Sequence, residues 1–507
     1  MTTYKNPIIP GFHPDPSICR AGEDYYLVNS SFEFFPGVPL FHSRDLVHWE
    51  QLGHVLTRRS QLELDGCRTS GGIYAPTIRY YNGRFYMTTT NVSSGGNFYV
   101  WTDDINSEWS DPVWISQKGI DPSFFFDDDG TVYFASTFYD EGGQGIGQCT
   151  IDINTGKMLA ETRLIWRGTG GKCPEGPHLY KRNGMYYLMI AEGGTEYGHM
   201  ETIARSPSPW GPFESCPNNP ILTHRDTDIA PEIFQGLGHA DIVDTPDGHS
   251  FVVFHGIRTT QFMLHHLGRE TMIAPLVWEA EGWPVINGGS MILPRMQVQN
   301  MPEPFLSEVS PLRDNFEGGS LAKTWSFLRN PDMDRYLLAQ RQGFLGLTAG
   351  EDTLDDCGSP TFIGRRQQHF NVRVQTLIDY APDSENDRAG LTVFHTNEHH
   401  YDLMVTRRHD ARVAVLRKRA GDMITESDPV ILPEQGDILL RIDSTSVEYS
   451  FYAGTDEQKL REVGKGRTQL LSSECMICTF TGCFMGLAVQ GSGTAWFDFF
   501  DYEPESI

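Results

Sequence analysis

Basic residues are scarce in this sequence, and their scarcity disfavours two classes of partner. The chain has 40 Lys and Arg against 66 Asp and Glu, a net charge of -26 over 507 residues. Nucleic acids and anionic membranes bind through phosphate groups, which reward basic patches. The sequence therefore predicts neither of these partners and favours a small neutral ligand.

Long apolar runs are also missing. No stretch approaches the roughly 18 apolar residues of a membrane span. The segment from Met1 to Pro7 has no basic region followed by an apolar one, as a secretion signal would. The chain as given is therefore expected to be cytoplasmic and to have no membrane partner.

A disulfide framework is absent too. The nine cysteines are odd in number and follow no framework spacing, which indicates reduced thiols. Cys475 and Cys478 form one CxxC pair, but it lies in an apolar, strand-like stretch without a second pair. Packing is the favoured interpretation over a zinc or redox site.

Instead, one short motif occurs five times, at intervals of roughly 45 to 65 residues. Each copy precedes a glycine-containing turn and an aromatic, β-rich run, which predicts a strand, a hairpin turn and a second strand. The copies are Asp15-Pro16-Ser17-Ile18, Ala75-Pro76-Thr77-Ile78, Asp121-Pro122-Ser123-Phe124, Glu175-Gly176-Pro177-His178-Leu179 and His239-Ala240-Asp241-Ile242.

The repeat predicts a five-bladed β-propeller, because one such unit cannot bury both of its faces alone. Equivalent positions of the innermost strands converge on the central channel of a propeller. Asp15, Asp121, Glu175 and His239 should therefore meet at one end of the channel. In the alternative interpretation, proline merely opens each strand; this explains the prolines but not three acids at one position.

The pattern changes after residue 300. Residues 301–312 read as a proline-punctuated linker between a propeller over 1–300 and a second domain over 313–507. Short alternating runs in the second domain predict an antiparallel β-sandwich of the jelly-roll, concanavalin-like kind, so that the whole chain is all-β. The runs are 372–377, 391–394, 401–405, 413–416, 438–442, 447–451, 484–487 and 496–499.

The second domain offers two weak metal candidates. His399 and His400 open a strand, where packing or a turn is favoured over metal binding. Asp314, Glu317 and Asp498 supply too few oxygens for calcium, and solvated turn acids are the favoured interpretation.

The three acids of the repeat suit hydrolysis of a glycosidic bond. An inverting glycosidase uses a carboxylic acid and a carboxylate about 6.5–9.5 Å apart, with the attacking water beside the carboxylate. Asp15, held between two prolines, suits the base, and the longer Glu175 suits the acid. The negative charge of Asp121 would raise the pKa of Glu175. Each Asp-Pro alone is more often a structural turn opener, but together they favour function.

Two basic residues remain open between a structural and a functional role. His239 is either a packed interior histidine or a group in the channel. Arg269 either pairs with Glu270 at a strand surface, or keeps the base ionised and bonds a sugar hydroxyl.

At these residues the chain resembles the family-43 glycoside hydrolases, in particular the two-domain β-xylosidase and α-L-arabinofuranosidase branch. The resemblance covers nearly the whole length. It runs through Asn6–Ile18, Ser31–Pro39, Gly71–Pro76, Pro174–His178, Ala191–Thr195, Gly238–Asp241, Leu267–Thr271, Gly364–Gln368 and Phe497–Tyr502.

The resemblance implies an inverting enzyme with Asp15 as base, Glu175 as acid and Asp121 as the pKa-modulating carboxylate. It places Arg269 and His239 in the active site, with calcium near His239 in some members and no required cofactor. Phe32 and Tyr74 would form apolar walls of the sugar pocket. The sandwich would lend a loop that helps close the pocket, which implies exo action on short chains. Relatives more often have Trp where this chain has Tyr74 and Phe35.

Several functional alternatives follow. A β-D-xylosidase is slightly favoured over an α-L-arabinofuranosidase or an enzyme with both activities. A retaining β-fructosidase would need Arg-Asp-Pro where this chain has Ile120-Asp121-Pro122. A non-catalytic sugar-binding propeller would be expected to have lost an acid. The partner is a small oligosaccharide in each case, and a homo-oligomer is compatible with the sequence.

Overall fold

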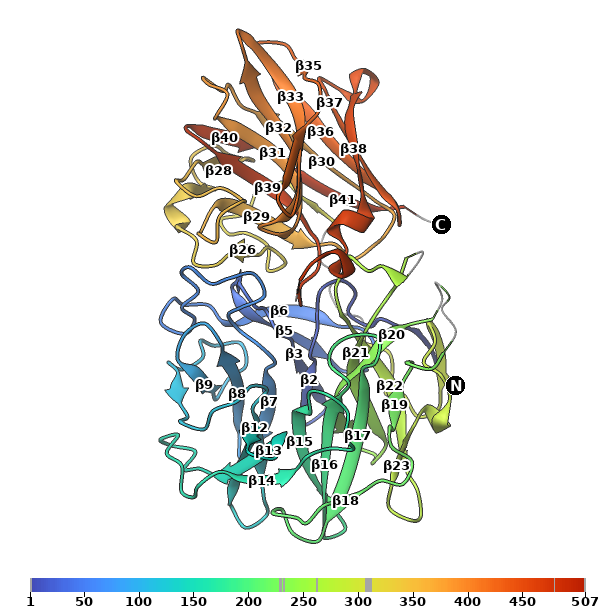
Figure 1. Ribbon diagram of the computed structural model, residues 1–507. Helices are drawn as coiled ribbons and strands as arrows, with labels where there is room; N and C mark the ends of the chain where they lie inside the picture. The colour runs from blue at the N-terminus through green and yellow to red at the C-terminus, as the bar shows by residue number, and fades with distance from the viewer. Residues whose placement is uncertain are drawn as a thin grey trace.

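The computed structural model describes residues 2–227, 230, 233–260, 263–305, 312–477 and 479–505. These residues form strands and short 3-10 turns, with no α-helix among them. Figure 1 shows two regions in contact, a propeller coloured blue to yellow-green and a sandwich coloured yellow to red. The predicted all-β class, five-bladed propeller and sandwich are confirmed.

Each blade is an antiparallel sheet whose first strand begins at the third residue of one copy of the repeat in blades 1 to 3 and includes the whole copy in blades 4 and 5. Blade 1 comprises β2 (Ser17–Ala21), β3 (Asp24–Val28), β5 (Gly37–Ser43) and β6 (Glu50–Leu56), and blade 2 comprises β7 (Thr77–Tyr81), β8 (Arg84–Asn91), β9 (Gly96–Thr102) and β10 (Val113–Trp114). Blade 3 comprises β11 (Ser123–Phe126), β12 (Val132–Asp140), β13 (Gly143–Thr150) and β14 (Arg163–Trp166).

Blade 4 has one extra strand, and blade 5 completes the ring. Blade 4 comprises β15 (Glu175–Arg182), β16 (Met185–Glu192), β17 (Met200–Ser206), β18 (Glu214–Ser215) and β19 (Leu222–Thr223). Blade 5 comprises β20 (Gln235–Asp244), β21 (Ser250–Ile257), β22 (Glu270–Trp278) and β23 (Pro284–Ile286).

The N-terminal segment holds the ends of the propeller together. Strand β1 (Thr2–Lys5) pairs antiparallel with β24 (Arg295–Val298). Further along, the Asn6 side chain donates to the carbonyl of Ile273 and accepts from its N–H. These are the two bonds that a neighbouring strand would make with Ile273 of blade 5. Because blade 1 follows directly, these bonds tie the first blade to the last.

A cluster of polar side chains crosses the channel around Asp241 of β20. Its carboxylate accepts hydrogen bonds from Ser17 Oγ, Arg79 Nη1 and Tyr180 OH, each at 2.7 Å, and so links blade 5 to blades 1, 2 and 4. Burial raises the pKa of Asp241, but Arg79 and the other partners outweigh it and lower that pKa to about 2. We call these four residues the Asp241 cluster.

The sandwich has two facing sheets. The larger contains β25 (Arg313–Asp314), β27 (Tyr336–Leu337), β28 (Leu345–Thr348), β30 (Val372–Asp379), β36 (Ile438–Ser444), β37 (Glu448–Gly454), β38 (Arg461–Arg467), β40 (Thr494–Phe497) and β41 (Phe500–Pro504). The other contains β29 (Thr361–Arg366), β31 (Arg388–Thr396), β32 (His399–Arg408), β33 (Ala411–Ala420), β34 (Met423–Glu426), β35 (Val430–Ile431) and β39 (Phe484–Gln490).

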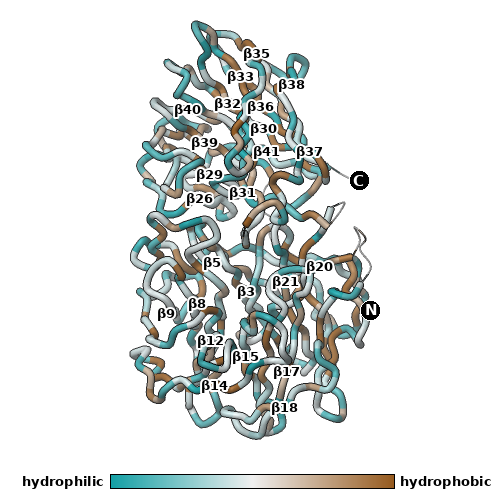
Figure 2. The backbone as a smooth tube through the Cα atoms, viewed as in Figure 1, coloured by the Kyte–Doolittle hydropathy of each residue, from teal (hydrophilic) through white to brown (hydrophobic). Residues whose placement is uncertain are grey.

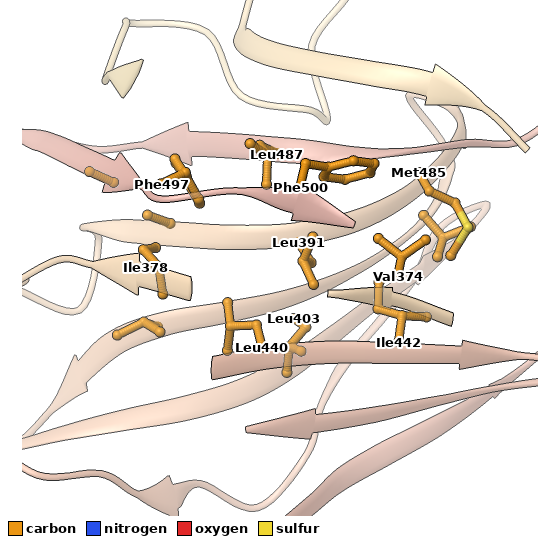
Figure 3. Close-up of a cluster of buried hydrophobic side chains, with 14 of the residues drawn as sticks. Val374, Ile378, Leu391, Leu403, Leu440, Ile442, Met485, Leu487, Phe497 and Phe500 are labelled. Atoms are coloured by element: carbon orange, nitrogen blue, oxygen red, sulfur yellow. The ribbon is translucent and has the colours of Figure 1, made fainter. Parts of the chain in front are cut away.

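The sandwich core lies between these sheets. Figure 3 shows Val374, Ile378 and Leu440 from the larger sheet facing Leu391 and Leu403 from the other, and all are fully buried. Strand β30 alternates buried and half-buried residues along its length, as its sequence pattern predicts for a strand with one face on the core. Burial of each such side chain stabilises the fold by about 1.5–3 kcal/mol.

Apolar segments are spread through both regions in Figure 2 and alternate with polar ones. Among the described residues, no helix is long and apolar enough to cross a membrane.

Backbone pairing joins the two regions. Strand β26 (Phe327–Leu328) leads into the sandwich and pairs with β4 (Phe34–Phe35) of the propeller. The next residue, Arg329, is fully buried, and its guanidinium donates to the Cys67 carbonyl at 2.6 Å. Phe35 therefore lies in the contact between the regions. The active-site pocket has other walls.

The residues considered as metal ligands in the second domain, His400 and Asp314, contact other protein side chains or backbone groups. His400 is buried between Asp355 and Asp402, at 3.0 and 2.9 Å. Asp314 accepts hydrogen bonds from Phe316 N and Trp325 Nε1. Cys475 is exposed, and Cys478 lies outside the described residues.

Candidate active site

The leading residues of the repeat meet at one mouth of the propeller channel. Asp15 and Asp121 precede the inner strands of blades 1 and 3, Glu175 opens that of blade 4 and His239 lies within that of blade 5, while Ala75 precedes the inner strand of blade 2. All five line one pocket with Phe32, Tyr74 and Arg269, so every residue predicted for the site lies there. The remaining lining residues are Ile120, Thr195, His199, His255 and Phe480.

The backbone is strained at three of the leading residues of the repeat. Asp15, Asp121 and His239 have φ angles of 52°, 56° and 54°, in the left-handed region that residues other than glycine seldom adopt. Such conformations cost about 1–3 kcal/mol each and persist where the surrounding structure imposes them. The same conformation recurs just before the inner strands of blades 1 and 3 and within β20 of blade 5, and the three side chains line the pocket at the mouth.

Asp15 is held as a carboxylate. Arg269 Nη1 donates to Oδ1 and Ser30 Oγ donates to Oδ2, both at 2.5 Å. Burial raises the pKa of Asp15, but the charge of Arg269, foremost among its partners, holds that pKa well below its usual range. Of the two roles open to Arg269 in the sequence, the structure thus shows the pairing with Asp15; Glu270 pairs with Arg258 instead.

The pKa values of Glu175 and Asp121 are raised, in contrast to that of Asp15. Burial, with the charge of Asp15 adding to it, raises the pKa of Glu175 to about 7. Burial and repulsion from Glu175 and Asp15 also raise the pKa of Asp121. Two such neighbours titrate as a pair, and the Gly176 N–H donates to Asp121 Oδ2 at 3.2 Å. That bond favours the anion on Asp121, but burial and the two neighbouring carboxylates outweigh it.

This arrangement refines the sequence prediction. An ionised Asp121 was expected to supply the charge that raises the pKa of Glu175. In the structure Asp15 is the charged neighbour that raises it most after burial, and Asp121 is itself pushed toward protonation. Glu175 and Asp121 therefore both have a raised pKa, and together they increase the affinity of the site for a proton.

His239 packs against Gly176 beside the acid. A Cβ on Gly176 would approach the His239 ring to 3.1–3.2 Å, and Gly176 has a φ of 58°, so this position requires glycine. His239 Nδ1 lies 3.8 Å from Asp15 Oδ1, beyond hydrogen-bonding distance. The His239 ring therefore lies close to Asp15 and against Gly176, the residue that follows the acid Glu175.

The surroundings of His239 do not fit calcium. Calcium takes six to eight oxygen ligands, whereas the nearby pocket residues His199 and His255 offer ring nitrogens. Asp15 is engaged by Arg269 and Ser30, and Asp241 by its own cluster. The described residues contain no group of three or more His, Cys, Asp or Glu side chains arranged to hold a metal.

Three aromatic rings form an apolar wall. The ring centroid of Phe32 is 5.2 Å from that of Tyr74 and 5.9 Å from that of Phe480, and the last two are 6.0 Å apart. Phe480 comes from the sandwich, just before β39. Its N–H donates to Ser70 Oγ at 2.9 Å and its carbonyl accepts from Arg269 Nη2 at 3.2 Å. This segment is the pocket-closing contribution of the sandwich that the resemblance implies.

Sequence reasoning missed four polar or aromatic residues of the pocket, Thr195, His199, His255 and Phe480. His255 ends the apolar run Phe251–Phe254, and a histidine in such a run is a signal that could have found it. Thr195 and His199 belong to a loop, and Phe480 to the other domain, where no repeat marks them.

A five-bladed propeller whose mouth combines an aspartate of lowered pKa with a glutamic acid of raised pKa has the features of a glycoside hydrolase. A buried acid with raised pKa and a separate carboxylate are the two groups that this reaction requires.

Comparisons with known proteins agree. Residues 4–284 match "Glycosyl hydrolases family 43", and residues 313–503 match "Beta xylosidase C-terminal Concanavalin A-like domain". The chain belongs to glycosyl hydrolase family 43, an inverting family.

Similar proteins extend over the full length of the chain. "Non-reducing end alpha-L-arabinofuranosidase BoGH43B" of Bacteroides ovatus is 42% identical, with 98% of this chain and 94% of that protein covered. "Xylosidase/arabinosidase" of Butyrivibrio fibrisolvens is 36% identical, with 99% and 98% covered. The solved structure of "xylan beta-1,4-xylosidase" from Bacillus halodurans has a TM-score of 0.94 at 35% identity, with 99% and 100% covered.

Proposed function

We propose that this enzyme releases terminal pentoses from the non-reducing ends of short oligosaccharides, such as xylo-oligosaccharides or arabinose-decorated ones. The observation that carries the proposal is the pocket at the mouth, which groups three carboxylates beneath an aromatic wall supplied by both domains. A wall that closes over the mouth suits a chain end better than the interior of a polymer.

The roles of the acids follow from their charge states. Glu175, which retains a proton near neutral pH, donates it to the glycosidic oxygen as the bond breaks. Asp15, kept ionised by Arg269, accepts a proton from the attacking water on the other face of the sugar. Asp121 is coupled to the acid and adds to the effect of Asp15 in raising the proton affinity of the pair. Arg269 holds both the base and the Phe480 carbonyl, so it aligns the base with the aromatic wall.

Two pentoses are candidates. A β-D-xylopyranoside and an α-L-arabinofuranoside present similar atoms around the scissile bond, so one pocket can accept both. Among the relatives, those named xylosidases support the first, and the 42% identical arabinofuranosidase supports the second. We propose activity on both, with β-D-xylosidase activity the larger.

The ratio of kcat/KM on the two 4-nitrophenyl pentosides tests this proposal directly. A larger value for the β-D-xyloside is expected, and a clear excess for the α-L-arabinofuranoside would reverse the order. NMR of the first product tests the stereochemistry independently. The β-D-xyloside should give α-D-xylose first, and initial release of the β anomer would exclude inversion.

We propose that the reaction needs no metal, because the residues near His239 lack the oxygens that calcium prefers. Dialysis against EDTA should leave kcat unchanged. A loss that calcium restores would contradict this.

A further inference from the structure

Asp15 contacts His255, a residue to which the proposed reaction scheme assigns no role. The Asp15 backbone N–H donates to His255 Nδ1 at 3.1 Å, across 240 positions of sequence. His255 is fully buried in β21 of blade 5, whereas Asp15 stands at the entrance to blade 1. This bond therefore spans the joint between the first and last blades at the catalytic mouth.

Nδ1 of His255 faces Asp15. It accepts the backbone N–H at 3.1 Å, because an amide can only donate, and it also lies 3.1 Å from the carboxylate Oδ1 of Asp15. Burial lowers the pKa of His255 to about 3, which keeps the ring neutral. On the other side of the ring, Nε2 lies 3.2 Å from His199 Nδ1 and 3.5 Å from Thr195 Oγ1, and His199 Nδ1 is also 3.2 Å from the Gly236 carbonyl oxygen.

His199 is itself immobilised. It is buried, and its ring stacks on that of His255 with centroids 4.9 Å apart and planes 25° apart. A Cβ on Gly238 would come within 2.7–2.9 Å of the His199 ring, so the adjacent backbone closes on it. The ring of His255 thus has a fixed partner on the side away from Asp15.

We infer that His255, held by His199, is a positioning residue that keeps Asp15 in its left-handed backbone conformation and so aims the base at the attacking water. The inference rests on the proposed role of Asp15. Asp15 has a φ of 52°, which is unfavourable by itself and persists only with an external restraint. Arg269 and Ser30 hold the carboxylate, and His255 Nδ1 contacts both that carboxylate and the backbone N–H of Asp15.

The test compares two substitutions of His255 that differ in the atom facing Asp15. In His255→Leu the acceptor is lost. In His255→Asn the side-chain oxygen occupies the place of Nδ1 and still accepts the N–H. We expect kcat to fall about 100-fold in His255→Leu, because a small misplacement of a catalytic group costs that much, with KM changed less than about twofold. His255→Asn should recover kcat to within about tenfold of wild type.

A matched control exists in the same domain. His224 is also buried, and its Nε2 accepts the backbone N–H of Ile292 at 3.1 Å, but it does not line the pocket. His224→Leu should lower the melting temperature and leave kcat unchanged. His199→Leu should give an effect between those of His224→Leu and His255→Leu.

Three results would overturn the inference: an unchanged kcat in His255→Leu, an equal loss in His255→Asn, or a rise in KM that accounts for the loss. If His255→Leu does not fold, crystal structures of His255→Asn and His255→Gln decide. Asp15 should keep its positive φ in the first and lose it in the second. Full activity of Asp15→Asn would instead refute the proposed function, whatever His255 does.

Discussion

The propeller channel contains the Asp241 cluster, with one buried carboxylate, and the catalytic mouth, with three. These two sites differ in how their negative charge is balanced. In the Asp241 cluster one acid receives bonds from Arg79, Ser17 and Tyr180, and its pKa falls to about 2. At the mouth three acids share one arginine, and the pKa of Glu175 rises to about 7.

The difference separates a structural site from a chemical one. Asp241 stands two residues after His239, and Ser17 two residues after Asp15, so both groups are built from the same short segments. Full pairing stabilises the ring of blades, because a paired buried charge costs far less than an unpaired one. Incomplete pairing leaves a proton that can be transferred.

The largest expected effect is at the mouth. Asp15→Asn and Glu175→Gln should each lower kcat by about 10²–10⁴-fold, since each removes a group that transfers a proton in the reaction. The melting temperature of Glu175→Gln should not fall below that of wild type by more than a few degrees, because repulsion among the acids is relieved. Steady-state kinetics and a thermal melt of the same samples make the measurement. If either variant kept a kcat within tenfold of wild type, the mouth could not be distinguished from the Asp241 cluster as the site of the chemistry.

The converse change is Asp241→Ala. We expect a loss of about 3–5 kcal/mol in the free energy of unfolding, because Arg79 is left buried without its partner. Urea denaturation measures it. The control Asp140→Ala removes an ion pair with Arg167 on the surface and should have no measurable effect on stability. A stable Asp241→Ala variant would show that the cluster does not hold the blades.

A smaller effect is expected at the wall that the sandwich supplies. Phe480→Ala should lower kcat/KM by about 10–100-fold, mainly through KM, because an apolar contact with the sugar is lost while the acids stay in place. The control Ile431→Ala alters a sandwich side chain that is 70% exposed and distant in sequence from the pocket. Equal kinetics of the two variants would show that the sandwich has no part in binding.

The smallest effect concerns pH and stability. The pKa of Glu175 is raised by folding, so its contribution to stability is complete below its unfolded pKa and is lost as pH rises through about 7. Wild type should therefore lose more stability than Glu175→Gln between pH 5 and pH 8, as measured by thermal melts. The kcat/KM of wild type should fall over the upper part of this range, as the acid loses its proton. Parallel stability curves for both proteins would contradict the raised pKa.

The sequence pattern predicted much of this architecture. The repeat located the inner strand of every blade, because glycine turns and proline-opened strands leave a local signal at each copy. It also brought Asp15, Asp121, Glu175 and His239 together, since equivalent positions of a propeller converge. No strand was predicted at β24, because its partner β1 lies nearly 300 residues away along the chain.

Other parts of the site had no such signal. Phe480 reaches the pocket through the packing of the sandwich on the propeller, and Thr195 and His199 reach it through a loop. His255 reaches Asp15 across the closure of the ring. None of these contacts is encoded by spacing along the chain.

By itself the sequence determined the number of blades, the identity of the three acids and their common location, because a repeat fixes which positions are equivalent. Only the tertiary structure decided which acid is ionised. That depends on which buried charges and hydrogen-bond donors lie within a few ångströms of each carboxyl, and Arg269, Ser30 and His255 come to Asp15 from different blades or loops.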